Sequence, residues 1–385
     1  MEKRTVGECF YQIRNGANIK QGVVDEGIPI TRIETIANDQ FNRDRMGYAG
    51  ITDIGKYESY LLEDGDLLMS HINSVRYLGR TVLYQKQGNE KIIHGMNLLG
   101  IKADRTIIDP AYARYYFCSP GFREQIGRIT KKSVNQASFS VADLKKLTVP
   151  VPSLSEQLEQ VRVLDKISHL ILLRQKELQM YDDLIKSRFV ELFGDPKHNK
   201  SNLVKIGEIG VLTSGGTPSR AKPEYFEGGI RWYNAGELNS LYLPDSVEHI
   251  SETALQQSAA KLFNKGTLMI GMYDTAAFKM GILTEDSSSN QACANLNPRQ
   301  GYNTVWLYYL FDIMKPIFLQ ERQGVRQKNL SLSKIKEFEV PFAPFELQEQ
   351  FAAFVQQTNK SKTFVQKALD EAQILFESLM QEYFG

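Results

Sequence analysis

The chain contains no apolar run long enough to cross a bilayer, although 42% of its 385 residues are hydrophobic. No apolar stretch follows Met1–Thr5, as it would in a secretory signal, so we expect a soluble, cytoplasmic protein with no membrane partner. The three cysteines, Cys9, Cys118 and Cys293, form no CxxC pair, which argues against a disulfide framework or a zinc ribbon. The five histidines show no metal-ligand spacing. We therefore expect no metal site.

Motifs of catalysis are also missing from the sequence. There is no Gly-Lys-Ser or Gly-Lys-Thr loop for a nucleotide phosphate, no Gly-x-Ser-x-Gly elbow and no Glu-x-Lys of a nuclease. The nearest nuclease-like triplets, Asp143-Leu-Lys145 and Asp195-Pro-Lys197, are interpreted as helix caps and turns. The sequence therefore predicts a non-catalytic protein that acts by binding.

The stretch from Pro150 to Gly194 predicts one long helix. Ser153 and Glu156 have the spacing of a capping box, in which each side chain satisfies a free amide of the first turn. Gly194 and Pro196 close the helix, since glycine tolerates the left-handed cap and proline cannot continue the hydrogen-bond ladder. About 38 residues would make a rod of roughly 57 Å.

Apolar residues recur along this helix in alternating steps of three and four, which is typical of a helix that packs along a partner helix. The C-terminal stretch from Phe351 shows the same steps, so we predict that the two helices pack on each other. The residues of this predicted seam are Leu164, Ile167, Ile171, Leu178, Ile185, Val355, Val365, Leu369, Phe376 and Leu379.

The two helical stretches belong to a tandem repeat. Lys186–Gly194 ends in Phe-Gly, as Glu377–Gly385 does. Further matches pair Gln136–Ser140 with Gln327–Ser331, Val149-Pro150 with Val340-Pro341 and, after a shift of two residues, Glu156-Gln157 with Glu349-Gln350. On this alignment the second helix has a longer entry than the first and lacks its Ser-x-x-Glu cap.

The repeat predicts an α+β chain with two strand-rich globular units and two long helices. The expected segments are 1–150 for the first unit, 151–195 for the central helix, 196–342 for the second unit and 343–385 for the C-terminal helix. Short strand-like runs divided by turns fill the units. Helices are expected from Pro110 to Phe117, from Gly121 to Ile129 and from Thr304 to Leu319.

The net charge is only +1, but the positive excess lies in the globular segments and the negative excess in the helices. Loops of both units combine basic side chains with amides, hydroxyls and aromatics, which can contact phosphates and base edges of double-stranded DNA. For any single residue, a solvated loop charge is the alternative. The candidate DNA-binding residues are Arg14, Asn18, Lys20, Arg32, Arg76, Arg80, Lys131, Lys132, Thr217, Arg220, Lys222, Tyr273, Lys279, Arg322, Arg326 and Lys328.

Several motifs resemble those of the specificity subunit of type I restriction-modification systems. The resemblance covers essentially the whole chain and is strongest from Pro152-Ser-Leu-Ser-Glu-Gln157 to Phe193-Gly-Asp-Pro196. The other stretches that carry it are Leu172–Lys176, Thr213–Pro218, Ile230–Trp232 and Ser289–Cys293.

This resemblance implies two target-recognition domains, each of which reads one part of a split DNA sequence, separated by two antiparallel spacer helices. It also implies assembly with two methyltransferase subunits and with ATP-driven restriction subunits. S-adenosylmethionine, ATP and Mg would then belong to those partners, and this chain would hold no cofactor. Since the loops of the two units differ, the two half-sites should differ in sequence.

Two questions stay open at this level. The modest charge also fits a protein–protein scaffold, whose helices bind partners and whose globular units bind no DNA. A third alternative, an autonomous nuclease, is disfavoured because the sequence lacks the Glu-x-Lys motif of a nuclease. In addition, Phe189, Phe193 and Phe384 near the helix ends either dock the methyltransferase subunits or are buried against the neighbouring globular unit.

Overall fold

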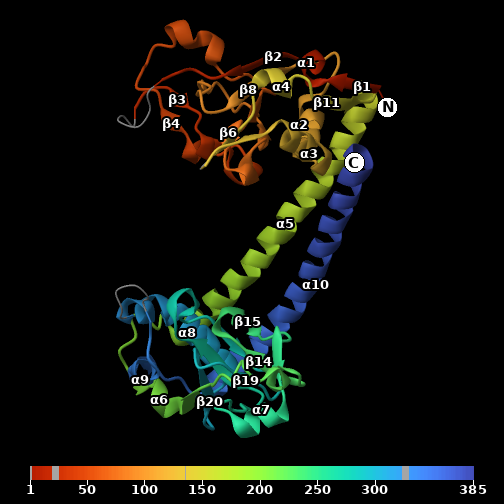
Figure 1. Cartoon of the computed structure of the whole chain (residues 1–385). Helices are drawn as coiled ribbons and strands as arrows, with labels where there is room; N and C mark the ends of the chain where they lie inside the picture. Colours follow the sequence, from red (N-terminus) through yellow and green to blue (C-terminus); the bar gives the residue numbers. More distant parts are fainter. Residues whose placement is uncertain (1, 20–25, 135, 323–328) are drawn as a thin grey trace. The chain divides into compact units, whose positions relative to one another are not determined.

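The computed structural model describes residues 2–19, 26–134, 136–322 and 329–385 (Figure 1). The chain divides into two compact units, which we call unit 1 (residues 1–174 and 368–385) and unit 2 (residues 175–367). Each unit combines a strand-rich globular part with sections of two long helices, α5 (Leu154–Phe193) and α10 (Phe345–Phe384). The fold class is α+β, as the sequence predicts.

Unit 1 is built on an antiparallel sheet with strand order β2-β8-β5-β7. A small sheet of order β6-β10-β9 and the pairs β1-β11 and β3-β4 surround it. The strands are β1 (Glu2–Thr5), β2 (Phe10–Asn15), β3 (Pro29–Ile30), β4 (Gly47–Tyr48), β5 (Leu67–Met69), β6 (Ile72–Asn73), β7 (Thr81–Leu83), β8 (Leu99–Ala103), β9 (Lys131–Lys132), β10 (Ala137–Ser138) and β11 (Thr148–Val151).

The helices of unit 1 begin where the sequence places capping residues. Asp109 accepts hydrogen bonds from the first amides of α2, and Ser119 caps α3 in the same way. Both predicted helices are therefore confirmed. The α-helices are α1 (Val6–Cys9), α2 (Pro110–Cys118), α3 (Pro120–Ile129) and α4 (Val141–Leu144), and the 3-10 helices are η1 (Ile33–Asp39), η2 (Arg43–Arg45), η3 (Gly55–Tyr60) and η4 (Val75–Tyr77).

Unit 2 has a larger sheet of order β13-β20-β17-β18-β15, in which only the β15–β18 pair is parallel. A second sheet of order β16-β14-β19 and the pair β12-β21 complete the described strands of the unit. The strands are β12 (Leu203–Lys205), β13 (Gly210–Ser214), β14 (Ile230–Tyr233), β15 (Asn239–Tyr242), β16 (Glu248–Ile250), β17 (Leu268–Gly271), β18 (Met280–Ile282), β19 (Ser288–Ser289), β20 (Cys293–Pro298) and β21 (Glu339–Pro341).

The longest helix of the globular part of unit 2 is α8, at the position that the sequence predicts, with Pro316 in its last turn. The other α-helices are α6 (Ile206–Ile209), α7 (Glu252–Gln257) and α9 (Leu332–Glu337), while α8 covers Thr304–Phe318. The 3-10 helices are η5 (Pro223–Phe226), η6 (Ala235–Glu237), η7 (Asp274–Ala276) and η8 (Leu319–Glu321).

Helix α5 is 40 residues long and has the predicted caps. The backbone amide of Ser153 donates to Glu156 at 2.9 Å, and the amide of Glu156 donates back to the Ser153 hydroxyl at 3.4 Å. At the other end Gly194 adopts a φ of 72°, a left-handed conformation that glycine takes without strain. Local sequence signals therefore set both ends of this helix.

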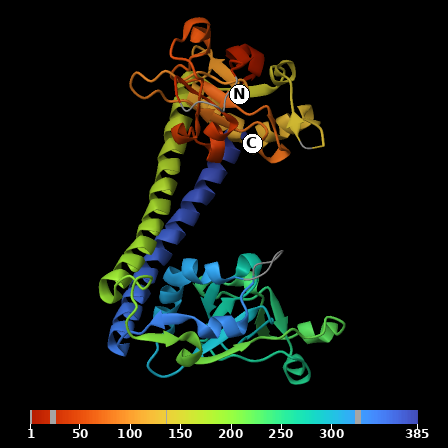
Figure 2. The same ribbon diagram turned by 90° about the vertical axis from the view of Figure 1, so that its left-hand side faces the viewer.

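In each unit the two long helices run antiparallel. In unit 1 the early residue Leu164 of α5 shares a core with the late residues Met380 and Phe384 of α10, and the end of α10 lies against the globular part of the unit in both views (Figure 1, Figure 2). In unit 2 the late residue Phe189 of α5 packs on the early residue Phe351, with ring centroids 5.3 Å apart. All ten residues of the predicted seam are buried or partly buried.

A buried glutamine joins each globular part to its long helix by the same three hydrogen bonds. In unit 1 the amide nitrogen of Gln157 donates to the carbonyl oxygens of Ile107 and Pro152 at 3.0 and 2.9 Å, and its oxygen accepts from the amide of Asp109 at 2.8 Å. Neither Gln157 nor its counterpart in unit 2, Gln348, is exposed to solvent.

Gln348 of unit 2 makes the matching contacts. Its amide nitrogen donates to the carbonyls of Gly301 and Ala343 at 3.3 and 2.8 Å, and its oxygen accepts from the amide of Asn303 at 2.8 Å. This geometry pairs Gln157 with Gln348. The alignment of Gln157 with Gln350, which needed a shift of two residues, is therefore wrong. The longer entry of the second helix, which was inferred from that shift, is wrong as well.

Candidate nucleic-acid interface

The small sheet β6-β10-β9 of unit 1 carries two of the predicted DNA-binding lysines. Its register aligns Ile72, Ser138 and Lys131 in one row across the three strands. Lys131 and Lys132 are both exposed, and within the described part of the chain neither side chain makes a hydrogen bond or an ion pair. Two cations are therefore available to phosphates on this sheet.

The 3-10 helix η4 and the residues after it follow β6 and contain two further predicted residues. The guanidinium carbons of Arg76 and Arg80 lie 5.5 and 4.6 Å from the centre of the Tyr77 ring. Arg80 also pairs with Asp39 at 3.1 Å, while Arg76 is exposed. The fold thus gathers Arg76, Arg80, Lys131 and Lys132 on segments that are joined by chain or by strand pairing.

The other predicted residues of unit 1 lie elsewhere. Arg14 is partly buried in β2, where its guanidinium donates to the carbonyl of Ser59 and lies 4.2 Å from the centre of the Tyr60 ring. Arg32 is partly buried beside η1, and Asn18 is exposed. Lys20 lies outside the described residues. Long-range contacts such as the one from Arg14 to Ser59 leave no trace in a sequence pattern.

The glycine-rich loop of unit 2 presents its polar residues in a different way. Arg220 forms a two-pronged ion pair with Glu248, which lowers the pKa of that carboxyl, and its guanidinium lies 4.2 Å from the centre of the Phe226 ring. Lys222 donates to the Tyr225 hydroxyl at 2.8 Å, and the hydroxyl of Thr217 donates to Gln291. The unit's own acidic, amide and aromatic groups therefore hold these three side chains.

Three further predicted residues of unit 2 lie around η7 and η8. Tyr273 is exposed beside η7, and Lys279 is partly buried just before β18. Arg322 donates from its Nε to the carbonyl of Leu319 at 3.0 Å. Arg326 and Lys328 lie outside the described residues.

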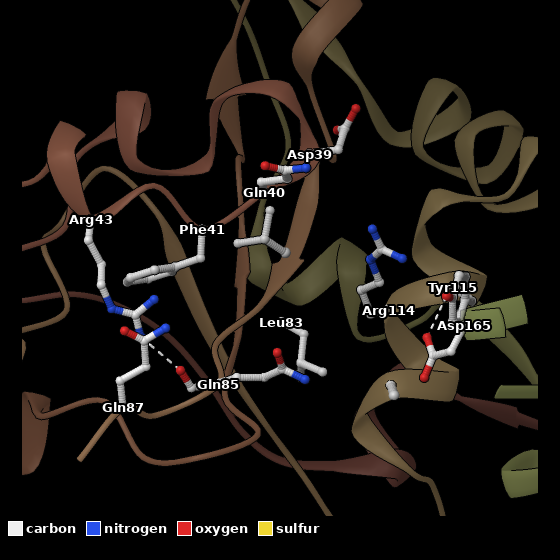
Figure 3. A pocket seen from close by; sticks show the side chains of 12 residues that line it. Asp39, Gln40, Phe41, Arg43, Leu83, Gln85, Gln87, Arg114, Tyr115 and Asp165 are labelled. Carbon is white, nitrogen blue, oxygen red and sulfur yellow. Dashed lines mark hydrogen bonds between the residues drawn. The ribbon is translucent and has the colours of Figure 1, made fainter. Parts of the chain in front are cut away.

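A cavity of about 300 Å³ lies in unit 1 among η1, β7, α2 and α5, where the sequence predicts no site (Figure 3). Phe41 and Arg43 form one side, and Arg114, Tyr115 and Asp165 form the other (Figure 3). Some of the polar groups in its wall are already engaged: Arg43 donates to the carbonyl of Gln85, and the Tyr115 hydroxyl donates to Asp165 at 2.6 Å.

Arg43, which lines this cavity, is held by an ion pair with Glu90. Arg43 binds both carboxylate oxygens of Glu90 at 2.9 and 2.6 Å, and Tyr84 and the amide of Gln87 also donate to Glu90. These hydrogen bonds, chiefly the one from Arg43, lower the pKa of Glu90 to about 2.

Two titratable side chains outside these regions are buried, and burial shifts their pKa values. Burial lowers the pKa of His94 to about 4 and raises the pKa of Cys9 to about 11. Within residues 2–19, 26–134, 136–322 and 329–385, no group of three or more His, Cys, Asp or Glu side chains could hold a metal ion. Across the same residues, no helix combines the length and apolarity that crossing a membrane requires.

The family model for the type I restriction modification DNA specificity domain matches residues 1–180 and, a second time, residues 199–372. The chain belongs to this family. Two specificity domains therefore lie in tandem, and each match includes one globular part and a large section of a long helix. The resemblance noted in the sequence is confirmed, and the chain has a DNA sequence-specificity function with two recognition domains.

Individual relatives agree with this assignment. A protein named as the specificity subunit of the type I restriction enzyme MjaX of Methanocaldococcus jannaschii is 26% identical over 91% of this chain and 85% of its own length. The EcoR124I/EcoR124II specificity subunit of Escherichia coli is 25% identical over 51% of each chain.

Solved structures of specificity subunits share the fold at lower identity. The type I restriction-modification S subunit of M. genitalium has a TM-score of 0.60 at 15% identity, covering 100% of this chain and 96% of its own. A chain from the type I R-M system, solved to explain complex assembly and conformational transition, has a TM-score of 0.56 at 16% identity and covers 100% and 97%. Both comparisons describe the fold alone.

Proposed function

We propose that this chain is the non-catalytic reading subunit of a type I restriction-modification complex, in which each unit recognises one half of a split, asymmetric DNA target. The observation that carries the proposal is the repeated junction. Gln157 and Gln348 attach the two globular parts to the long helices by the same three hydrogen bonds. One frame thus presents two recognition surfaces.

The two surfaces differ in chemistry, which supports unequal half-sites. Unit 1 offers exposed Lys131 and Lys132 on a small sheet. In the glycine-rich loop of unit 2, by contrast, Arg220 is tied to Glu248. Phosphate contacts position a protein on DNA and base contacts specify the sequence, so different side chains on one frame favour different base pairs.

The long helices supply surfaces for the methyltransferase subunits. In unit 2 the side chains of Met180 and Phe364 are 69% and 77% exposed, and in unit 1 those of Ile374 and Leu375 are 67% and 51% exposed. Large apolar side chains that face water on an otherwise polar helix favour a protein partner. We place methyltransferase docking at these residues, because Phe189 and Phe384 are buried and Phe193 is partly buried within their own units.

The chemistry of the complex would belong to its partners. In this proposal S-adenosylmethionine binds the methyltransferase subunits, and ATP and Mg bind the restriction subunits that join for cleavage. This chain then binds the target sequence and so positions the partner subunits along the DNA. The isolated chain neither methylates nor cleaves.

The test is to produce the chain with the methyltransferase subunit encoded beside it and to map the methylated adenines on genomic DNA. We expect a split, asymmetric motif with an unread spacer. A stable complex with an active methyltransferase that yields no motif would overturn the proposal in favour of a scaffold that binds proteins and not DNA.

A further inference from the structure

The sheet β6-β10-β9 of unit 1 has one face toward the core and one toward solvent. Side chains alternate between the faces along each strand, and residues that pair across strands share a face. Ala137 and Phe139 are buried, so their face is the inner one. Ile72, Ser138 and Lys131, which form one row of the register, therefore belong to the outer face.

Gln136 stands immediately before β10 and continues this outer face by one step. It stands two residues before Ser138 and is exposed. Its backbone carbonyl accepts hydrogen bonds from the amide and the hydroxyl of Ser133, at 2.8 and 2.9 Å, which fixes the backbone position. The Gln136 side-chain amide, within the described residues, makes no hydrogen bond. A fixed backbone thus carries an amide that is available to a ligand.

The outer face combines the side-chain types that DNA readout uses. Lys131 is exposed and can neutralise a phosphate. Ile72, on the edge strand β6, is an apolar side chain that is 41% exposed, so it can contact a thymine methyl group. The amide of a glutamine matches the N6 donor and N7 acceptor of adenine in the major groove, which is wide enough for a β-ribbon.

We propose that the outer face of sheet β6-β10-β9 enters the major groove and that Gln136 determines one base of the half-site read by unit 1, by pairing with an adenine. Lys131 positions the sheet on the backbone, and Ile72 contacts a thymine methyl at the same or the next base pair. This inference rests on the proposed function and names the residue through which unit 1 exerts it.

The test uses the complex of the full chain with its methyltransferase subunit, and it compares the methylated motif of the wild type with those of Gln136 variants. Gln136→Ala removes the amide, so one A·T position in the unit 1 half should become degenerate, with roughly 10- to 100-fold lost discrimination. Gln136→Glu keeps the shape but only accepts hydrogen bonds, so the same position should come to prefer cytosine.

A matched control is Gln300→Glu, the same change at an exposed glutamine of unit 2, which should leave both half-sites unchanged. If the wild type gives a split motif and both Gln136 variants keep that motif, the inference is overturned while the proposed function stands. If the wild type gives no motif, the proposed function itself fails. A change in the unit 2 half-site caused by Gln136→Glu would also overturn the inference.

Discussion

Replacing Gln157 with leucine should loosen unit 1 while leaving unit 2 intact. The substitution puts an apolar side chain of similar size into a site without solvent exposure. It removes the partners of three backbone groups, the carbonyls of Ile107 and Pro152 and the amide of Asp109. At about 1 kcal/mol for each hydrogen bond, we expect a loss of about 3 kcal/mol, with more if the orphaned groups find no water.

The same helix offers a matched control. The side-chain oxygen of Gln160 is buried and accepts no hydrogen bond among the described residues, so Gln160→Leu removes no hydrogen bond there and should not destabilise unit 1. Gln348→Leu provides the mirror experiment, because it should loosen unit 2 by about as much as Gln157→Leu loosens unit 1.

Hydrogen exchange read peptide by peptide suits this chain, since a protein of two units need not unfold in one transition. Gln157→Leu should lower the protection of the amides in β2, β8 and α2 by roughly 100-fold, which corresponds to about 3 kcal/mol. Equal protection in the Gln157→Leu and Gln160→Leu variants would refute the reasoning.

Three further predictions concern charge and docking. The pKa of Glu90 is held at about 2, below its value in the unfolded chain. The stability that the Glu90 carboxylate contributes to unit 1 is therefore complete above about pH 4.5 and is lost as the pH falls through 2. Glu90→Gln should cost about 1–3 kcal/mol of stability at pH 7 and should flatten the acid unfolding of unit 1, measured by circular dichroism. Lys131→Ala should lower the slope of log affinity against log salt by about one, whereas Arg322→Ala, whose guanidinium is held by Leu319, should lower it less. Phe364→Asp should weaken methyltransferase binding at least tenfold in calorimetry, and an unchanged affinity would remove this residue from the docking surface.

Local and periodic features of this fold could be read from the sequence. The Ser153–Glu156 box, the Gly194 cap and the starts of α2 and α8 depend on neighbouring residues, and the structure has all of them. The pairing of Gln157 with Gln348 could not be read, because two Glu-Gln dipeptides suggested a shift while the contacts that define the match come from distant loops.

The candidate site was only partly predictable for the same reason. The two adjacent lysines lie on β9, one edge strand of the small sheet, and Arg76 lies in η4, just after the other edge strand β6, so strand pairing in this sheet links the three residues. Arg220 and Arg14, by contrast, are held by Glu248 and by the carbonyl of Ser59. A loop arginine that is available to DNA and one that is held by the protein look alike in sequence, since their partners lie tens of residues away.

The central claim is that each unit reads one half of the target independently. Its most direct test is to replace residues 1–150 with the corresponding unit of another specificity subunit, retaining Gln157 and both long helices, and to map adenine methylation by the assembled methyltransferase. We predict that one half of the motif changes while the other half and the spacer remain. A change in both halves, or in neither, would contradict the account.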